Sequence, residues 1–184
     1  MPPHLFFPSK MEHLAKIISN KPMAPDARKI QLRLSGSLTP AQPGQFGHLR
    51  LDDKNPLLRR PFSIYSIDRN KLEIVYQVIG KGTSLMSRLK PGATLNILGP
   101  LGQGFQINRS NQLSVLVGGG IGIAGLHLLL KRLIRAGKPV CIFIGARSKS
   151  RLYCLPDIKK LCSDVHIATE DGSAGYKGLV TELL

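Results

Sequence analysis

Residues 115–125 read VLVGGGIGIAG, and from Gly120 onward they have the spacing G-x-G-x-x-G. The preceding run LSVLV (113–117) predicts a buried β-strand, and AGLHLLLKRLIRAG (124–137) has the apolar period of a helix with a terminal glycine. Glycines at such a junction let backbone N–H groups and a helix N-terminus approach a phosphate, because no Cβ intervenes. The stretch predicts a nucleotide-binding turn. The plainer alternative is a tight strand-to-helix turn without a ligand.

The residues that follow repeat this alternation. PVCIFIGA (139–146) is another buried strand, a helix is expected around 154–162, and DVHIATE (164–170) is a third strand. Strands that alternate with helices predict a parallel sheet with right-handed crossovers, which is a Rossmann-like α/β arrangement.

Two features at the ends of these strands bear on the nucleotide. An NAD-type fold has an acidic residue roughly 20 residues after the glycines to bind the ribose. Here IFIGARSKS (142–150) supplies Arg147 instead, so the nucleotide is held differently or a 2′-phosphate is accommodated, and NAD and NADP both stay open. Thr169, Glu170 and Asp171 lie at the carboxyl end of the third strand, where open α/β sheets bind ligands, although an ordinary acidic loop explains them equally well.

The first half of the chain, from Leu14 to about Phe105, has a different pattern. A helix is expected over GTSLMSRL (82–89), with Thr83 as its N-cap. Short runs that alternate or are apolar, separated by Gly/Pro turns, predict an antiparallel barrel or sandwich. These predicted strands are KIQLRL (29–34), HLRL (48–51) and KLEIVYQVI (71–79).

Two stretches of this half are candidates for binding an anion. In LLRRPFSI (57–64), Arg60 can form a charge-assisted hydrogen bond to a phosphate and Ser63 can add a hydroxyl donor. GKGT (80–83) precedes a helix and offers backbone amides. The plainer interpretation is a solvated charge pair on an edge strand.

The change of sequence pattern between the two halves divides the chain into a β-barrel domain, 11–108, and an α/β domain, 109–184.

Composition limits the functional classes. The chain of 184 residues is 42% hydrophobic and 20% charged, with a formal net charge of +15. Its cations are scattered and its aromatic residues are few, so we expect no nucleic-acid partner. Three cysteines without zinc-site spacing predict no bound metal and a reducing, cytoplasmic compartment. The apolar stretch within the opening MPPHLFFPSK is too short for a signal peptide or a membrane anchor.

The residues carry no acid–base motif but several cofactor-holding features, which favours chemistry done by a cofactor. Taken together, RRPFSI, GKGT, GPLGQGF (99–105), VGGGIGIA and TEDGS resemble the ferredoxin–NADP reductase superfamily. Within it, the chain from about residue 13 to its end is similar to the electron-transfer subunits of NAD-dependent (class 1B) dihydroorotate dehydrogenases.

The resemblance implies an enzyme subunit, a flavin-dependent oxidoreductase component, with FAD at the barrel and NAD(H) at the α/β domain. It also implies an FMN-containing catalytic subunit as partner, in a heterotetramer that serves de novo pyrimidine (UMP) biosynthesis. No residue is expected to act as an acid or base. The implied flavin-side residues are Arg60, Pro61, Phe62, Ser63, Tyr76, Gln77, Val78, Gly82 and Thr83. The implied nucleotide-side residues are Gly119, Gly120, Gly122, Arg147, Thr169 and Asp171.

The chain departs from this family in one respect. Members carry a [2Fe–2S] cluster on four cysteines in a C-terminal tail, and those ligands are absent from this chain, which predicts a truncated α/β domain. Two alternatives remain. One is a stand-alone or hydrogenase- or transhydrogenase-associated NAD(P)H–flavin or ferredoxin reductase, and the other is a non-enzymatic basic binding module.

Overall fold

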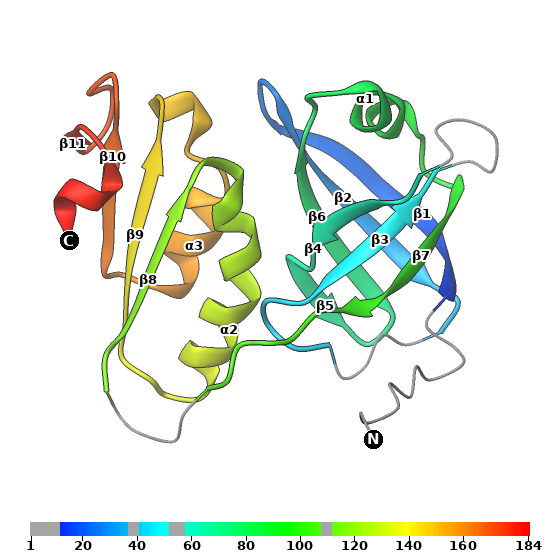
Figure 1. Ribbon diagram of the computed structural model, residues 1–184, viewed down its shortest axis with the longest axis horizontal. Coiled ribbons are helices and arrows are strands. Elements are labelled where there is room, and N and C mark those ends of the chain that lie inside the picture. The colour runs from blue at the N-terminus through cyan, green and yellow to red at the C-terminus, as the bar shows by residue number, and fades with distance from the viewer. Residues whose placement is uncertain (1–11, 37–40, 52–57, 108–111) are drawn as a thin grey trace, which may run out of the picture.

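The computed structural model describes residues 12–36, 41–51, 58–107 and 112–184, which form two sheets side by side (Figure 1). The first sheet is antiparallel and the second is parallel. This confirms the predicted fold class, a β-barrel followed by a Rossmann-like α/β unit. The proposed boundary between domains 11–108 and 109–184 lies outside the described residues, so that division stays a prediction.

The first sheet has the strand order β4-β3-β7-β1-β2-β6-β5. The sheet curls so that its two ends approach each other, and Phe62 on β4 packs edge-on against Tyr76 on β6 with ring centroids 6.0 Å apart. Its interior is filled by apolar side chains such as Ile30, Leu32 and Ile74. Its strands are β1 (Glu12–Ala24), β2 (Ala27–Leu34), β3 (Phe46–Arg50), β4 (Arg60–Ser63), β5 (Ser66–Asp68), β6 (Lys71–Gln77) and β7 (Thr94–Leu101).

The barrel carries one helix, α1 (Lys81–Arg88), between β6 and β7. The prediction of Thr83 as its N-cap is wrong, because Gly80 occupies the cap position. Thr83 instead lies in the first turn, where its hydroxyl accepts hydrogen bonds from the backbone N–H groups of Ile79 and Gly80 at 3.0 and 3.1 Å. The threonine therefore supports the start of the helix from inside it.

The parallel sheet has the order β11-β10-β9-β8. Strand β8 (Ser114–Gly119) runs into the 3₁₀ helix η1 (Gly120–Leu126) and then α2 (His127–Arg135), so the predicted single helix is divided. The remaining elements are β9 (Val140–Ala146), the 3₁₀ turn η2 (Lys149–Arg151), α3 (Leu155–Leu161), β10 (Val165–Thr169), β11 (Tyr176–Lys177) and the 3₁₀ helix η3 (Val180–Leu183).

Helices α2 and α3 lie on the face of the parallel sheet that looks toward the barrel (Figure 1). Leu116, Ile142 and Ile144 of the sheet form one core with these helices. On the opposite face Val115 and Val117 are 49% and 38% exposed. Among the described residues, no helix combines the length and apolar character needed to cross a bilayer.

Candidate functional site

The first of two neighbouring pockets, the barrel pocket, has a volume of about 570 Å³. It is formed by β4, the end of β6, the first turn of α1 and the glycine turn of η1. Segments far apart in the sequence, including both candidate anion-binding stretches, therefore meet at one cavity. The predicted site residues that line it are Arg60, Pro61, Phe62, Ser63, Tyr76, Gln77, Gly82, Thr83 and Gly122.

Arg60 lies directly against the first turn of α1. A Cβ built on Gly82 would come within 2.2 Å of Arg60 Nε, so only glycine permits this approach. The guanidinium also donates a hydrogen bond to the carbonyl oxygen of Leu58. Arg60 and the backbone of α1 therefore present a cation and helix N-terminal amides to the same part of the cavity, which is the donor set that binds phosphates.

The aromatic side of the barrel pocket is held by the barrel core. Tyr76 is buried, and its hydroxyl donates a hydrogen bond to Asn20 Oδ1 at 3.0 Å. Burial raises the pKa of the Tyr76 hydroxyl, so this side chain is neutral. Ser63 faces the α/β unit, since a Cβ on Gly125 would lie 3.3 Å from Ser63 Oγ. The third glycine of the G-x-G-x-x-G stretch therefore lets the two units approach each other.

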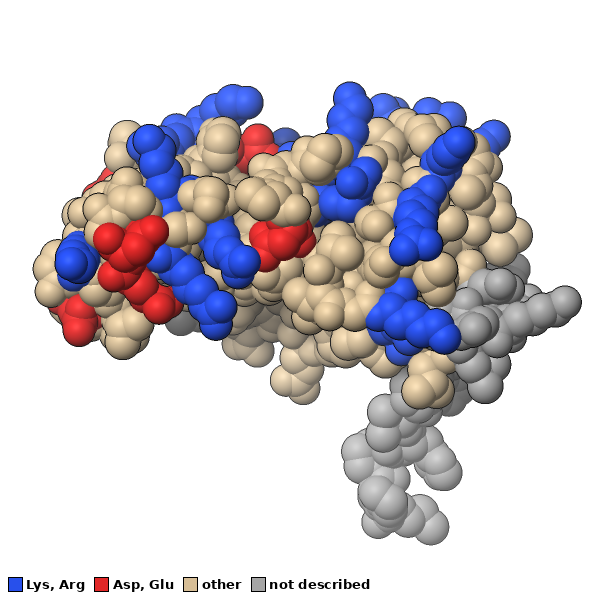
Figure 2. Space-filling view, turned by 90° about the horizontal axis from the view of Figure 1, so that it is seen from above, with Lys and Arg blue, Asp and Glu red and all other residues tan. Residues whose placement is uncertain are grey.

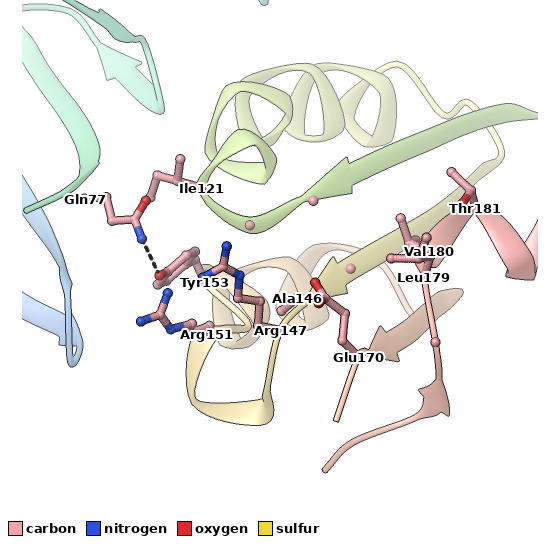
Figure 3. Close-up of a pocket in the computed structure, with 14 residues that line it drawn as sticks. Gln77, Ile121, Ala146, Arg147, Arg151, Tyr153, Glu170, Leu179, Val180 and Thr181 are labelled. Carbon is pink, nitrogen blue, oxygen red and sulfur yellow. Dashed lines mark hydrogen bonds between the residues drawn. The ribbon is translucent and has the colours of Figure 1, made fainter. Parts of the chain in front are cut away.

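The second cavity, the sheet pocket, has a volume of about 520 Å³. It lies at the carboxyl ends of β8, β9 and β10, the edge at which open α/β sheets bind ligands. Of the predicted nucleotide-side residues, Gly119, Gly120 and Arg147 line it, and the predicted flavin-side residue Gln77 lines it as well. Figure 3 shows Arg147 and Arg151 on one side of the pocket and Leu179, Val180 and Thr181 on another.

The sequence analysis did not predict Arg151 and Tyr153, which line the sheet pocket, and it placed Glu170 at a strand end without assigning it a binding role. Glu170 directly follows β10, so the acidic side chain expected after the second strand follows the third strand instead. Arg151 and Tyr153 lie on the turn before α3, for which the sequence has no signal.

Three predicted residues line neither pocket. Thr169 is fully buried, and its hydroxyl donates to the carbonyl of Ala174 at 2.8 Å, so it braces the loop after β10. Asp171 accepts hydrogen bonds from the N–H and hydroxyl of Ser173, which lower the pKa of its carboxyl. The backbone N–H of Val78 donates a hydrogen bond to the backbone carbonyl oxygen of Asp26 at 2.8 Å.

Gln77 and Ile121 line both pockets and form a wall between them. The Gln77 amide donates to Asp26 Oδ2 at 2.7 Å and to the Tyr153 hydroxyl at 3.1 Å, and Tyr153 donates to Asp26 Oδ1 at 2.6 Å. Burial and the bond to Asp26 raise the pKa of Tyr153 to about 12. Asp26 also forms an ion pair with Arg151 at 3.4 Å. Burial opposes ionisation of Asp26, but the hydrogen bonds from Tyr153 and Gln77 together with this cation lower the pKa of its carboxyl. A network centred on the Asp26 carboxylate therefore joins the barrel to the turn before α3 and holds Gln77 in this wall; Figure 3 shows its Gln77–Tyr153 bond.

A second network joins the units on the side of α2 and α3. Asp157 accepts hydrogen bonds from Lys29 Nζ at 2.6 Å and from the Tyr65 hydroxyl at 2.8 Å. Burial opposes ionisation of Asp157, but these two donors outweigh it and lower its pKa. The ring of His127 stacks on Tyr65 with centroids 3.9 Å apart, and its Nδ1 lies 3.0 Å from the Tyr65 carbonyl oxygen.

We expect acid to weaken this second network. Burial lowers the pKa of His127, and the charges of Lys131 and Lys29 lower it further, against opposing contributions from the Tyr65 carbonyl and Asp157. The unfolded chain therefore binds a proton on this histidine first, and the free energy of unfolding falls as the pH drops below about 6.5. The lowered pKa of Asp157 has the same sign, so its contribution is lost below about pH 4.

Urea unfolding at about pH 7.5 and 5.5 measures the histidine part of this effect. In His127→Phe, the phenyl ring keeps the stack on Tyr65 and removes the titration. This variant should have a lower free energy of unfolding than the parent at both pH values. The difference in its free energy of unfolding between the two pH values should be smaller than in the parent. An unchanged difference would contradict the assignment to His127.

The surface around the pockets is rich in cations. Figure 2 looks onto the face that holds α1 and the carboxyl ends of the parallel strands, and lysine and arginine side chains are spread over both halves of it. Acidic side chains are fewer and gather mainly toward the α/β end. With a net charge of +15, this face favours the approach of anionic ligands.

The three cysteines do not form an iron–sulfur site. Cys141, Cys154 and Cys162 are all buried free thiols, and burial raises the pKa of Cys154 to about 12. A [2Fe–2S] cluster of the ferredoxin type requires four thiolates. The cysteines of this chain therefore do not fit that group.

No family model matches the chain. Curated relatives do: the chain is 38% identical over 175 residues to "Dihydroorotate dehydrogenase B (NAD(+)), electron transfer subunit" of a Geobacillus species, covering 91% of this chain and 67% of that protein. It is 40% identical over 181 residues to the protein of the same name from Enterococcus faecalis, covering 95% of this chain and 68% of the relative. The chain therefore spans about two thirds of the length of these relatives.

Solved structures agree on the fold. The chain superposes with a TM-score of 0.80 and 32% identity on the NADH-dependent reduced ferredoxin–NADP oxidoreductase, over 92% of this chain and 61% of that one. The ferredoxin reductase of carbazole 1,9a-dioxygenase gives a TM-score of 0.82 at 22% identity, over 94% of this chain and 55% of that chain. The second likeness concerns the fold alone.

Proposed function

Because the chain belongs to the family of dihydroorotate dehydrogenase B (NAD(+)) electron transfer subunits, we propose that it binds FAD in the barrel pocket and NAD(H) in the sheet pocket. The observation that carries this proposal is the single wall, Gln77 and Ile121, between the two pockets. Two redox cofactors that exchange a hydride must come into direct contact, and pockets that share a boundary allow their reacting rings to meet there. FAD supplies the ability to take up one or two electrons, and the protein holds and orients the cofactor.

The barrel pocket fits FAD in its donor set. Arg60 and the amides of Gly82 and Thr83 suit the pyrophosphate, and the missing Cβ of Gly82 lets the Arg60 side chain lie against the first turn of α1. Phe62 and Tyr76 suit the ring system, and Ser63 supplies a hydroxyl. Pro61 lines the same proposed site, and Val78 belongs to it through its backbone, which holds the end of β6 in place.

The sheet pocket fits a dinucleotide in a similar way. Gly119 and Gly120 leave backbone amides accessible at the end of β8, and Arg147 and Arg151 offer positive charge. Gly122, which the resemblance assigns to the nucleotide side, lines the barrel pocket instead. Glu170 is the acidic side chain available to ribose hydroxyls, so we propose NAD(H) as the nucleotide. Thr169 and Asp171 support this pocket by holding the loop that follows β10.

The partner that we propose is the FMN-containing catalytic subunit of dihydroorotate dehydrogenase, in a heterotetramer that serves pyrimidine biosynthesis. Its support is the name of the relatives, which describes a subunit that transfers electrons. The partner would deliver electrons from dihydroorotate, and this chain would pass them to NAD⁺.

The test begins with the purified chain and FAD. We expect a yellow protein that keeps one flavin per chain through gel filtration, and whose flavin absorption is bleached by NADH under anaerobic conditions. NADPH should bleach it much more slowly. A protein that stays colourless after incubation with FAD would overturn the proposal.

Two further outcomes separate the alternatives. NAD(P)H-dependent reduction of dyes at full rate, with no response to the catalytic subunit, would favour a stand-alone reductase. Salt-sensitive binding to polyanions without flavin would favour a basic binding module, since counterion release gives a steep salt dependence.

A further inference from the structure

We propose that Cys141, Asp164 and His166 form a binding site for a divalent cation of the zinc type, separate from both pockets. A cysteine Sγ, a carboxylate oxygen and an imidazole nitrogen, one from each residue, all lie within 4.8 Å of one another. The site lies at the amino end of the parallel sheet. The two pockets lie at or beyond the opposite end.

The strand register brings these three side chains together. Ile142 of β9 is paired with Val165 of β10, so Cys141 lies beside Asp164. The backbone supports this pairing, because the Ile142 N–H donates to the Asp164 carbonyl at 3.0 Å. Asp164 and His166 are two residues apart along an extended chain, so their side chains point to the same face. That face is the one not covered by α2 and α3.

The ligand types select the cation. Zinc accepts thiolate, imidazole and carboxylate ligands together, whereas Mg²⁺ and Ca²⁺ take oxygen ligands. Bond lengths of about 2.0–2.3 Å place the ligand atoms of a tetrahedral zinc roughly 3.3–3.7 Å apart. His166 Nε2 and Asp164 Oδ1 are 2.9 Å apart, and the full set lies within 4.8 Å, so small side-chain rotations reach zinc geometry.

The surroundings permit those rotations. The side chains of His166 and Asp164 are 48% and 54% exposed, so water can complete the coordination. The ring of His166 stacks on Phe143 with centroids 4.7 Å apart, which holds its plane beside β9. Only Cys141 is buried, and it supplies the ligand to which zinc binds most strongly among these three.

The spacing C-x₂₂-D-x-H matches no common zinc motif, which explains why the sequence predicted no metal. The chain offers a matched control in Cys162, a second buried thiol nearby. Its Sγ donates to the carbonyl oxygens of Val140 at 3.4 Å and Asp164 at 3.5 Å. Cys162 is therefore engaged with the backbone, and it is not part of the proposed ligand set.

The experiment titrates the full chain with Zn²⁺ against a chromophoric chelator, and with Co²⁺ to detect the near-ultraviolet thiolate-to-metal transition. We expect one ion per chain. Cys141→Ser should abolish the Co²⁺–thiolate transition, and His166→Gln should weaken Zn²⁺ binding by roughly 100-fold, at least the cost of losing an outer-shell partner. Cys162→Ser should bind like the parent.

Folding is checked on the same samples by circular dichroism and by FAD retention, which none of these substitutions should change. The site would be overturned if the chain took no Zn²⁺ from the chromophoric chelator beyond what the buffer alone takes. Equal losses in Cys162→Ser and Cys141→Ser would overturn the assignment of its ligands. His166→Gln with parental affinity would overturn it as well.

Discussion

Arg60→Ala is expected to release FAD from the chain, with an affinity roughly 10–100-fold weaker than that of the parent. The reason is the loss of a charge-assisted hydrogen bond to phosphate, which contributes about 1.5–3 kcal/mol. Arg60 is the cation of the barrel pocket that lies against the glycine of α1. Fluorescence titration of the apoprotein with FAD measures the change directly.

Arg59→Ala is the matched control, because the two arginines are adjacent and only one lines the pocket. Arg59 forms an ion pair with Glu12 and donates to the His48 carbonyl at 3.3 Å, at the edge of the barrel. Its loss removes an exposed ion pair, which is worth about 0–1 kcal/mol of stability and nothing of flavin affinity. Equal effects of the two substitutions on FAD binding would show that the assignment of the pair is wrong.

Gly175→Ala is expected to cause the largest loss of stability. Gly175 lies in the turn between β10 and β11 with φ at +66°, and an added Cβ would come within 2.1 Å of the Ile167 carbonyl oxygen. The left-handed backbone alone costs about 1–2 kcal/mol, and the clash with the backbone of β10 brings the total to at least about 3 kcal/mol. Urea unfolding followed by far-ultraviolet circular dichroism measures it.

Gly137→Ala separates the two contributions, because Gly137 has the same φ of +66° but no atom within 4 Å of its added Cβ. This control should lose only the backbone part, about 1–2 kcal/mol. If both variants unfold at the same urea concentration, the clash with β10 adds nothing to the loss in the free energy of unfolding, and the prediction is refuted.

The fold was predictable where apolar periodicity is strong. The runs at 113–117, 139–146 and 164–170 are β8, β9 and β10 to within two residues at each end. The sequence could not predict that the helix after β8 starts as η1. Glycines at 120, 122 and 125 are poor helix formers, and the sequence does not show which type of helical turn they adopt.

The site was predictable in part for a physical reason. Glycines and an isolated arginine within an apolar run are visible in a sequence because they contradict their surroundings. Tyr153 and Asp26 are ordinary residues in their own segments, and they matter only because folding brings them within 2.6 Å. Val78, Thr169 and Asp171 line neither pocket, because a strand end places a residue near a site without turning its side chain into it.

The wall formed by Gln77 and Ile121 would touch both proposed ligands, so any shift of this wall couples their binding free energies. If one nucleotide shifts the wall and thereby tightens the other by some factor, the second must tighten the first by the same factor. The affinity for FAD measured without nicotinamide nucleotide is therefore one of four binding constants in a thermodynamic cycle. The other three constants can be measured independently to test whether the cycle closes, with no assumption about the rate of electron transfer.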